Sequence, residues 1–376
     1  MRIALVHDHL CGIGGSERIF QYFCEEFSDA DVYTLAYNSE TTLPFFAHRK
    51  IHTTWMNRWI RTSEAFRWSF PIAASVMQRL DLSHYDLILS SSATTAKYVK
   101  APKGRHLCYC YIPTRALWHY DQYFGRGFKR YLIKPFLNAL RKRDFRIAQN
   151  VDRFIAISES SRNYIRQYYH RDSEVIYCPI DTDRFRPVNH RKLDHYLLVS
   201  RLETWKKVEY AIEAFNALGK PLKIVGSGSE EAKLRKMAKS NIVFVGSLSD
   251  VELAQEYALC KAVIFTPFLE YGLIPLEANA SGTPVICYGR GGVEETMIPV
   301  GHISKKPPTA IFFYEQTAAS LADAVRIFET ASFDPNALVE HASHWSIDSF
   351  KKKMREKVLQ HLGSLHVEKG CLPKKS

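Results

Sequence analysis

Residues 262–288 read AVIFTPFLEYGLIPLEANASGTPVICY, and this stretch predicts the fold of the C-terminal half of the chain. Two apolar runs rich in β-branched residues, 262–267 and 284–288, have the composition of buried strands. Between them, Pro275 suits the first position of a helix and Gly282 suits its end. A strand, a helix and a second strand in this order are typical of a parallel sheet covered by helices.

The same alternation extends over the whole chain. Apolar runs that predict further strands lie at 3–6, 86–91, 106–111, 154–158, 175–178, 196–200, 222–226 and 241–246. Amphipathic segments such as 208–218 and 250–260 predict the helices between them. A chain of 376 residues is too long for one hydrophobic core, so we expect two α/β domains, 1–188 and 189–345. The polar, proline-bearing segment 181–195 is the predicted linker.

The composition is that of an ordinary globular protein. Apolar residues make up 46% of the chain and charged residues 24%, which is ordinary for a globular protein. No apolar run reaches the roughly 18–20 residues that span a bilayer, and the start does not resemble a signal peptide, so we expect a cytoplasmic protein. The eight cysteines include no CxxC pair, which favours reduced, buried thiols over a zinc or disulfide site.

The formal net charge of +12 requires an anionic partner or a basic surface. Basic residues concentrate in 126–146, and they alternate with tryptophan and phenylalanine in 49–70. Interleaved aromatic and basic residues suit the headgroup region of an anionic membrane, although a solvated helix face with its aromatics in the core explains the same pattern. No recognisable nucleic-acid-binding module accompanies the charge, so we expect no nucleic acid partner.

Two short motifs follow predicted strands and open predicted helices. The first, GIGGSE at 12–17, lets the backbone approach a ligand and presents a helix N-terminus to an anion, although a plain strand-to-helix turn would have the same sequence. The second, SRLETWKK at 200–207, contains Arg201 and Lys206, which can converge on a diphosphate. Cations are unfavourable at a helix start unless an anion binds there, so we favour a binding role over surface charge.

The decisive stretch 262–288 itself predicts a third anion-binding loop. The backbone amides of Tyr271, Gly272 and Leu273 precede the predicted helix and would face a bound phosphate. We expect Glu277 in the first helical turn, where it can accept hydrogen bonds from sugar or ribose hydroxyls. Glu270 lies in the loop before the helix.

Taken together, these motifs resemble the retaining glycosyltransferases of family 4. The resemblance covers most of the chain and includes residues 156–165, 175–187, 200–215, 223–230, 243–250, 266–285 and 289–296. It implies the GT-B fold, with two Rossmann-like domains whose parallel sheets face each other across a cleft. It also implies an N-terminal acceptor domain, a C-terminal nucleotide-sugar domain, and a final helix at 346–362 that crosses back to the first domain.

Residues 108–120, CYCYIPTRALWHY, are similar to the bacterial mannosyltransferase-like branch that makes O-antigen or exopolysaccharide, often from GDP-mannose. The resemblance therefore implies transfer of a hexose, most simply mannose, to a lipid-linked saccharide. It implies a hexosyltransferase that needs no metal or other cofactor and lies at the inner face of the plasma membrane. The alternatives are a UDP-sugar-dependent enzyme of the same fold and a non-catalytic nucleotide-sugar-binding protein.

The family pattern assigns roles to residues that match its motifs. Gly14 and Gly15 would border the donor phosphate and the acceptor, and Gly226 would belong to the nucleotide-sugar site. Arg201 and Lys206 would act in catalysis by neutralising the nucleoside diphosphate as it leaves. The acceptor oxygen would attack from the side of the leaving group, with the β-phosphate accepting its proton.

The sequence departs from the family pattern at two places. Glu270 and Glu277 are seven positions apart, whereas the family's paired glutamates usually stand eight apart. If Gly272 and Pro275 are kept in register, Leu269 occupies the first glutamate position, so either the loop is one residue shorter or Glu270 reaches in from the next position. Glu270 is nonetheless assigned to the hydroxyls of the transferred sugar as a catalytic residue. Tyr111 replaces a histidine common in this branch, and we assign Tyr111 and Arg115 to acceptor binding.

Overall fold

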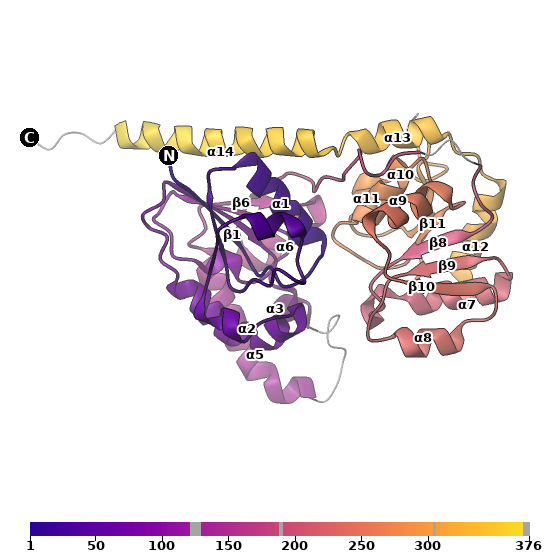
Figure 1. Ribbon diagram of the computed structural model, residues 1–376, viewed down its shortest axis with the longest axis horizontal. Coiled ribbons are helices and arrows are strands. Elements are labelled where there is room, and N and C mark those ends of the chain that lie inside the picture. The colour runs from indigo at the N-terminus through magenta and orange to yellow at the C-terminus, as the bar shows by residue number, and fades with distance from the viewer. Residues whose placement is uncertain (121–128, 188–190, 304–305, 371–376) are drawn as a thin grey trace, which may run out of the picture. The chain divides into compact units, whose positions relative to one another are not determined.

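The computed structural model describes residues 1–120, 129–187, 191–303 and 306–370, and its contacts divide the chain into two compact units. Unit 1 comprises Met1–Cys178 and Phe350–Ser376, and unit 2 comprises Pro179–Ser349 (Figure 1). The contact boundary precedes the boundary expected after residue 188 because the segment that follows Cys178 packs within unit 2. There the Phe185 ring lies 5.5 Å from the Tyr257 ring.

Unit 1 is built on a seven-stranded, fully parallel sheet with the strand order β3-β2-β1-β4-β5-β6-β7. The central strands are buried along their length, as expected for strands that helices cover on both faces. The strands are β1 (Ile3–His7), β2 (Asp31–Thr34), β3 (Ile51–Thr53), β4 (Leu87–Ser92), β5 (His106–Cys110), β6 (Arg153–Ala156) and β7 (Ser173–Val175).

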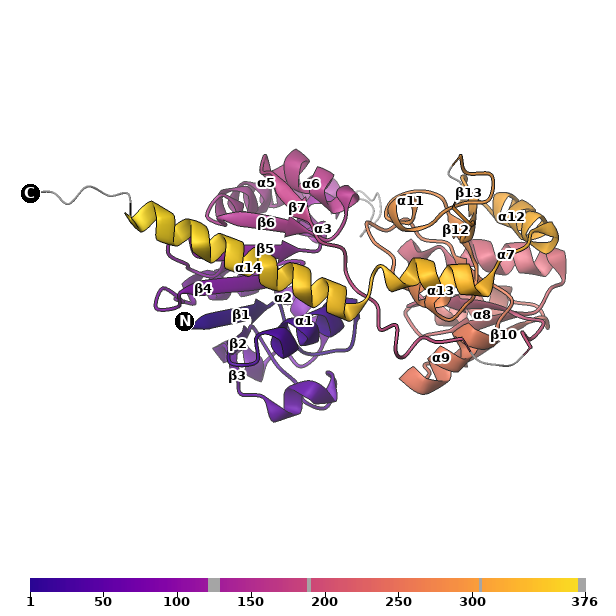
Figure 2. The ribbon, with the colours of Figure 1, turned by 90° about the horizontal axis from the view of Figure 1, so that it is seen from above.

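Helices that follow the strands cover this sheet. They are α1 (Gly15–Glu26), α2 (Ser63–Arg79), α3 (Arg115–Trp118), α5 (Lys129–Ala148), α6 (Glu159–Tyr169) and α14 (Ile347–Gly370), with 3₁₀ turns η1 (Pro44–His48), η2 (Trp55–Arg58) and η3 (Ala96–Tyr98). Thr62 and Ser158 cap α2 and α6 by accepting backbone N–H groups. Helix α14 runs beside α1 (Figure 2), where Lys351 forms an ion pair with Glu25 and Phe350 packs against Phe23.

Unit 2 contains a six-stranded parallel sheet with the order β10-β9-β8-β11-β12-β13. The strands are β8 (Tyr196–Val199), β9 (Leu222–Val225), β10 (Ile242–Gly246), β11 (Val263–Phe265), β12 (Val285–Tyr288) and β13 (Ala310–Phe313). The helices are α7 (Val208–Leu218), α8 (Glu231–Met237), α9 (Asp250–Leu259), α10 (Leu273–Ala280), α11 (Val293–Thr296), α12 (Ala318–Thr330) and α13 (Pro335–Ser343), with the 3₁₀ turn η4 (Thr204–Lys206).

Local sequence explains these helices. Helix α7 buries the stripe Val208, Ala211, Ile212 and Phe215 in the core on one face of the sheet. The residue after its last residue is Gly219, whose φ of 67° suits a helix C-cap. Helix α9 begins with a capping box between Ser249 and Glu252. The expected α/β architecture of two Rossmann-like domains is confirmed.

Each sheet has one point at which the strand order reverses. In unit 1 this point lies between β1 and β4, and in unit 2 it lies between β8 and β11. Open parallel sheets bind ligands outside the carboxyl ends of the strands at such a reversal. The loops after β1, β4, β8 and β11 are therefore the places to look for a site. Within the described ranges, no helix combines the length and the apolar character needed to cross a bilayer.

Candidate functional site

The loop after β8 brings Arg201 and Lys206 to the same aromatic ring. The Arg201 guanidinium carbon lies 5.6 Å from the centre of the Trp205 ring, and the Lys206 ammonium nitrogen lies 4.2 Å from it. Arg201 is exposed, whereas Lys206 is only 9% exposed. Both cations therefore lie near one indole at the strand reversal, and a planar fork and a point charge suit a diphosphate.

A hydrogen bond ties this loop to the end of the neighbouring strand. The Thr266 hydroxyl, directly after β11, donates to the Lys206 carbonyl at 2.8 Å. The Thr266 carbonyl in turn accepts from the Gln316 amide at 3.0 Å. Lys206 therefore lies beside the first residue of the loop that leads to α10, so the second and third motifs of the sequence occupy one region of unit 2.

Helix α10 begins earlier than the sequence predicted. Its first residue is Leu273, so Pro275 is the third helical residue, not the first, and Glu277 is the fifth, beyond the first turn. The expectation was wrong because every residue of the first turn lacks an intrahelical N–H partner, which makes proline acceptable throughout that turn. Gly282, with a φ of 66°, lies just beyond the helix end as expected. Gly272 precedes the helix and supplies no side-chain cap.

Glu277 has a defined orientation. Its carboxylate accepts a hydrogen bond of 3.0 Å from the Tyr257 hydroxyl. Burial of Tyr257, followed by the negative charge of Glu277, raises the pKa of the phenol well above its usual value, so the hydroxyl remains a donor. A carboxylate can accept several hydrogen bonds, so a glutamate held in this orientation suits a contact with ligand hydroxyls.

The loop that contains Glu270 packs against the loop after β12. The Gly292 N–H donates to the Leu269 carbonyl at 2.8 Å, and a Cβ on Gly292 would lie 2.5 Å from the Glu270 carbonyl oxygen. Leu269 and Tyr271 pack against the apolar core of unit 2, and Glu270 is buried. Leu269 is therefore packed against the core, and Glu270, the next residue, carries the carboxylate of this loop.

The backbone conformation directly after β9 requires a glycine at position 226. Its φ is 123°, and a Cβ there would lie 1.9 Å from the Ser200 carbonyl oxygen. The glycine lets the loop after β9 approach Ser200, the residue that precedes Arg201. Gly226 thus supports the position of the cation-bearing loop.

In unit 1 the structure brings the glycine turn and Tyr111 together. Gly14 is the N-cap of α1 and Gly15 is its first residue. The Tyr111 hydroxyl donates to the Ser16 carbonyl at 3.1 Å and lies 2.9 Å from the Ser91 hydroxyl. Tyr111 therefore joins the first turn of α1 to the end of β4 at the strand reversal of unit 1.

Arg115 begins the short helix α3, four residues beyond Tyr111. Thr114, its neighbour, belongs to a buried network around Asp144 of α5. Asp144 lies 3.2 Å from the Lys97 ammonium nitrogen, and the side chains of both residues are fully buried. Asp144 also accepts from the hydroxyls of Tyr98 and Tyr169 and from the Trp118 indole. This network fixes α3, and with it the backbone that carries Arg115.

The sequence HDH at 7–9 has a structural role at the end of β1. Asp8 accepts four backbone N–H bonds of 2.6–2.9 Å from residues 93–96 and so holds the loop after β4 in place. His7 stacks on Phe20 and lies 4.0 Å from the Glu17 carboxylate. Burial raises the pKa of Glu17, but the hydrogen bond and charge of His7 and the charge of His9 lower it to about 2.

Sequence reasoning missed three of these contributions. Trp205 lies between Arg201 and Lys206 in the motif at 200–207, and this position was the signal that could have indicated its contact with both cations. Thr266 was the first residue of the quoted loop, but its bond to Lys206 joins residues 60 positions apart, so no local pattern indicates it. No local pattern indicates the role of Asp8 either, because its hydrogen bonds reach residues more than 80 positions away.

Two family models match the chain, one for each unit. The model described as "Glycosyltransferase Family 4" matches residues 13–184, and "Glycosyl transferases group 1" matches residues 179–345. The two matches join near the boundary between the units. Together with the two Rossmann-like sheets, they support a glycosyltransferase family with the GT-B fold.

Curated relatives match parts of the chain at low identity. A glycogen synthase of Mycobacterium tuberculosis is 34% identical over 141 residues, or 35% of this chain and 32% of that protein. A GDP-mannose-dependent phosphatidylinositol monomannoside mannosyltransferase of the same organism is 28% identical over 183 residues, 40% of this chain and 48% of that protein. The aligned part of the chain thus spans less than half the length of these relatives.

Solved structures resemble the chain over nearly its whole length. Sucrose-phosphate synthase from Thermosynechococcus elongatus has a TM-score of 0.71 at 17% identity and covers 97% of this chain and 100% of its own. HepE from Anabaena, solved with UDP, has a TM-score of 0.69 at 15% identity, with 96% and 100% covered. At these identities the likeness establishes the fold.

Proposed function

We propose that the protein is a retaining, metal-independent glycosyltransferase that moves a hexose from a nucleotide-sugar to a lipid-linked saccharide in cell-surface polysaccharide synthesis. The observation that carries the proposal is the convergence of Arg201 and Lys206 on Trp205 beside the Thr266 loop. A diphosphate bound there gains charge as the sugar leaves, and two preformed cations stabilise that charge without a metal.

The other residues of unit 2 take complementary roles. The amides of Tyr271, Gly272 and Leu273 at the start of α10 would add N–H donors to the diphosphate. Glu277, oriented by Tyr257, would accept hydrogen bonds from the hydroxyls of the ribose. Glu270 would contact the hydroxyls of the transferred sugar from the loop before α10.

Unit 1 would hold the acceptor. Gly14 and Gly15 at the start of α1 would border the acceptor, and the Tyr111 hydroxyl lies beside that turn. Arg115 would contact an anionic part of the acceptor. The acceptor oxygen would attack from the side of the leaving diphosphate, whose β-phosphate would take the proton.

The names of relatives support mannose from GDP-mannose as the donor. The M. tuberculosis relative is named for GDP-mannose and a phosphatidylinositol mannoside. An O-antigen chain mannosyltransferase of Escherichia coli is 31% identical over 98 residues. A lipid-linked acceptor would place the protein on the cytoplasmic face of the plasma membrane as a peripheral protein.

Transfer from radiolabelled GDP-mannose to a butanol-extractable lipid fraction, with EDTA present, tests the proposal. We expect labelled lipid to form with the wild type and to fall to background in Arg201→Gln. The anomeric configuration of the product, measured by NMR, should match that of the donor. Label that requires a divalent cation, or a product of inverted configuration, would contradict the mechanism. Transfer from a UDP-sugar instead would contradict the choice of donor.

A further inference from the structure

Unit 1 exposes three tryptophan side chains to solvent. Trp55, Trp59 and Trp68 are 62%, 75% and 74% exposed, whereas large aromatic residues are ordinarily buried for most of their area. Trp55 is the first residue of the η2 turn, Trp59 directly follows this turn, and Trp68 lies in α2. Ile72, one turn further along α2, is 56% exposed and extends the same stripe.

Helix α5 contributes to the same end of unit 1. Arg143 of α5 donates hydrogen bonds to Ser75 and Gln78 of α2, at 2.9 and 2.8 Å, and Figure 1 shows the two helices together. Phe136 of α5 is 54% exposed. We call the solvent-facing side of η2, α2 and α5 the tryptophan–arginine surface.

This surface is strongly basic. Residues 55–79 and 134–146 contain nine arginines and lysines and two acidic residues. One of the two, Asp144, is fully buried and paired with Lys97, so Glu64 is the only acidic residue of these segments that faces solvent. Arg58, Arg79 and Arg146 are exposed among the apolar side chains.

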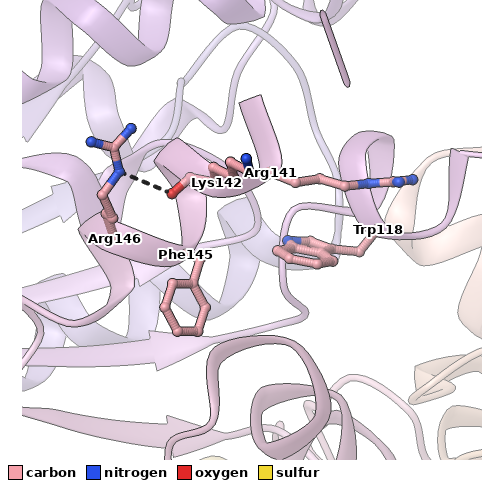
Figure 3. Close-up of a pocket in the computed structure, with 5 residues that line it drawn as sticks. All are labelled: Trp118, Arg141, Lys142, Phe145 and Arg146. Atoms are coloured by element: carbon pink, nitrogen blue, oxygen red, sulfur yellow. Dashed lines mark hydrogen bonds between the residues drawn. The ribbon is translucent and has the colours of Figure 1, made fainter. Parts of the chain in front are cut away.

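A pocket of about 360 Å³ borders α5 on this basic segment. Arg141, Lys142 and Arg146 line it together with the rings of Trp118 and Phe145 (Figure 3). The two rings and the aliphatic stems of the basic side chains make this lining apolar, which suits an apolar chain.

We propose that the tryptophan–arginine surface docks the protein onto an anionic membrane, with the exposed indoles inserted at headgroup level. The proposal rests on the proposed function and deepens it, because a lipid-linked acceptor lies in such a membrane. Indole rings favour the interface between headgroups and acyl chains, and basic residues beside them attract anionic lipid. The apolar side chains stand on three separate elements with arginines between them, which fits a fluid lipid surface better than a shaped protein pocket.

Co-sedimentation of the full chain with large vesicles tests the proposal. Vesicles of phosphatidylcholine alone are compared with vesicles that contain 30% phosphatidylglycerol, at low and high salt. We expect binding to the anionic vesicles alone, weakened by salt. Dibrominated lipids should quench the tryptophan fluorescence, because the indoles enter the bilayer. Equal binding to both vesicles, or binding without quenching, would overturn the proposal, and absence of binding would favour an acidic protein partner instead.

Paired variants identify the surface. Trp59→Ser with Trp68→Ser should weaken vesicle binding about tenfold or more and abolish most of the quenching. The matched control is Val251→Ser with Ile327→Ser, which removes two apolar side chains of unit 2 that are 68% and 52% exposed. The control should bind as the wild type does. Equal loss in both double variants would overturn the assignment to this surface.

The charge is tested in the same way. Arg58→Gln with Arg79→Gln should weaken binding by about fivefold per cation. Lys352→Gln with Lys353→Gln makes the same charge change on α14, which Figure 1 shows on the other side of unit 1 from α2 and α5. Equal loss in the two variants would indicate a response to net charge alone and contradict a local surface.

Nucleotide binding separates this proposal from the proposed function. Thermal shifts with GDP and UDP should be the same in all four double variants as in the wild type, because the substitutions lie outside the loops after β8 and β11. Vesicle binding without any nucleotide shift would contradict the proposed function and leave the docking surface intact. A nucleotide shift without vesicle binding would do the reverse.

Discussion

Lys206→Met tests the proposed diphosphate site at its buried cation. The Lys206 residue is 9% exposed and its ammonium nitrogen lies 4.2 Å from the centre of the Trp205 ring, so little water reaches this side chain. Two unit charges about 4 Å apart at an effective dielectric constant of about 20 interact by ~4 kcal/mol. That energy corresponds to a loss of about 1000-fold in kcat/KM, close to the effect of removing one oxyanion-hole donor from a hydrolase.

Lys207→Met is the matched control. Lys207, the neighbouring lysine, has the same charge. Its ammonium nitrogen lies 3.7 Å from the Glu209 carboxylate, whereas that of Lys206 lies near the Trp205 ring. Both variants lower the net charge by one, so long-range electrostatics change equally. In a sugar-transfer assay, we expect Lys206→Met to lose 100-fold or more and Lys207→Met to stay within about threefold of the wild type. Similar losses in both, or wild-type turnover in Lys206→Met, would refute the assignment of Lys206 to the diphosphate.

Three further predictions concern the supporting structure. Gly226→Ala should unfold or strongly destabilise unit 2, by about 3 kcal/mol or more in a denaturant titration, because the new Cβ would lie 1.9 Å from the Ser200 carbonyl oxygen; a wild-type midpoint would contradict the described loop. Asp144→Asn should cost about 3–5 kcal/mol of unfolding free energy because it leaves the Lys97 charge buried without its counterion, and Lys97→Met in the same chain should restore part of that loss. Burial lowers the pKa of His106 to about 4, so the folded protein favours the neutral ring. About 3 kcal/mol of unfolding free energy is therefore lost as the pH falls from 6.5 to 4. If the unfolding free energy of His106→Gln has the same pH dependence as that of the wild type, His106 is not its source.

The fold followed from sequence where a local pattern was strong. The segment 208–218 is helix α7 with the same bounds, and the alternating cysteines 108 and 110 lie in β5, where both are buried. All seven cysteines within the described ranges are buried free thiols, as the absence of CxxC pairs indicated.

Two short edge strands were not predicted. Strand β3 has three residues, Ile51–Thr53, and lies at the edge of its sheet, so it carries no continuous apolar run. Strand β13, Ala310–Phe313, was also missed. The strand predicted at 175–178 is in fact β7, Ser173–Val175, because its partner β6 ends at Ala156 and offers no further residue to pair with.

The candidate site was predictable as far as its motifs were contiguous. Arg201, Lys206 and the loop before α10 follow neighbouring strands, and the general rule for parallel sheets places them together. The start of α10 was two residues earlier than expected, because proline tolerates every position of a first helical turn. Contacts between residues distant in sequence, such as Thr266 with Lys206, depend on the tertiary fold and leave no local trace.

Thermal-shift binding of the wild-type protein with GDP, GDP-mannose, UDP, UDP-glucose and ADP, with and without EDTA, tests the central claim most directly. The loops after β8 and β11 are proposed to hold a nucleoside diphosphate through Arg201 and Lys206, with no metal. The account therefore predicts that GDP and GDP-mannose raise the melting temperature, that EDTA leaves the rise unchanged, and that Lys206→Met removes it. A melting temperature that no nucleotide changes, or a rise that disappears with EDTA, would contradict it.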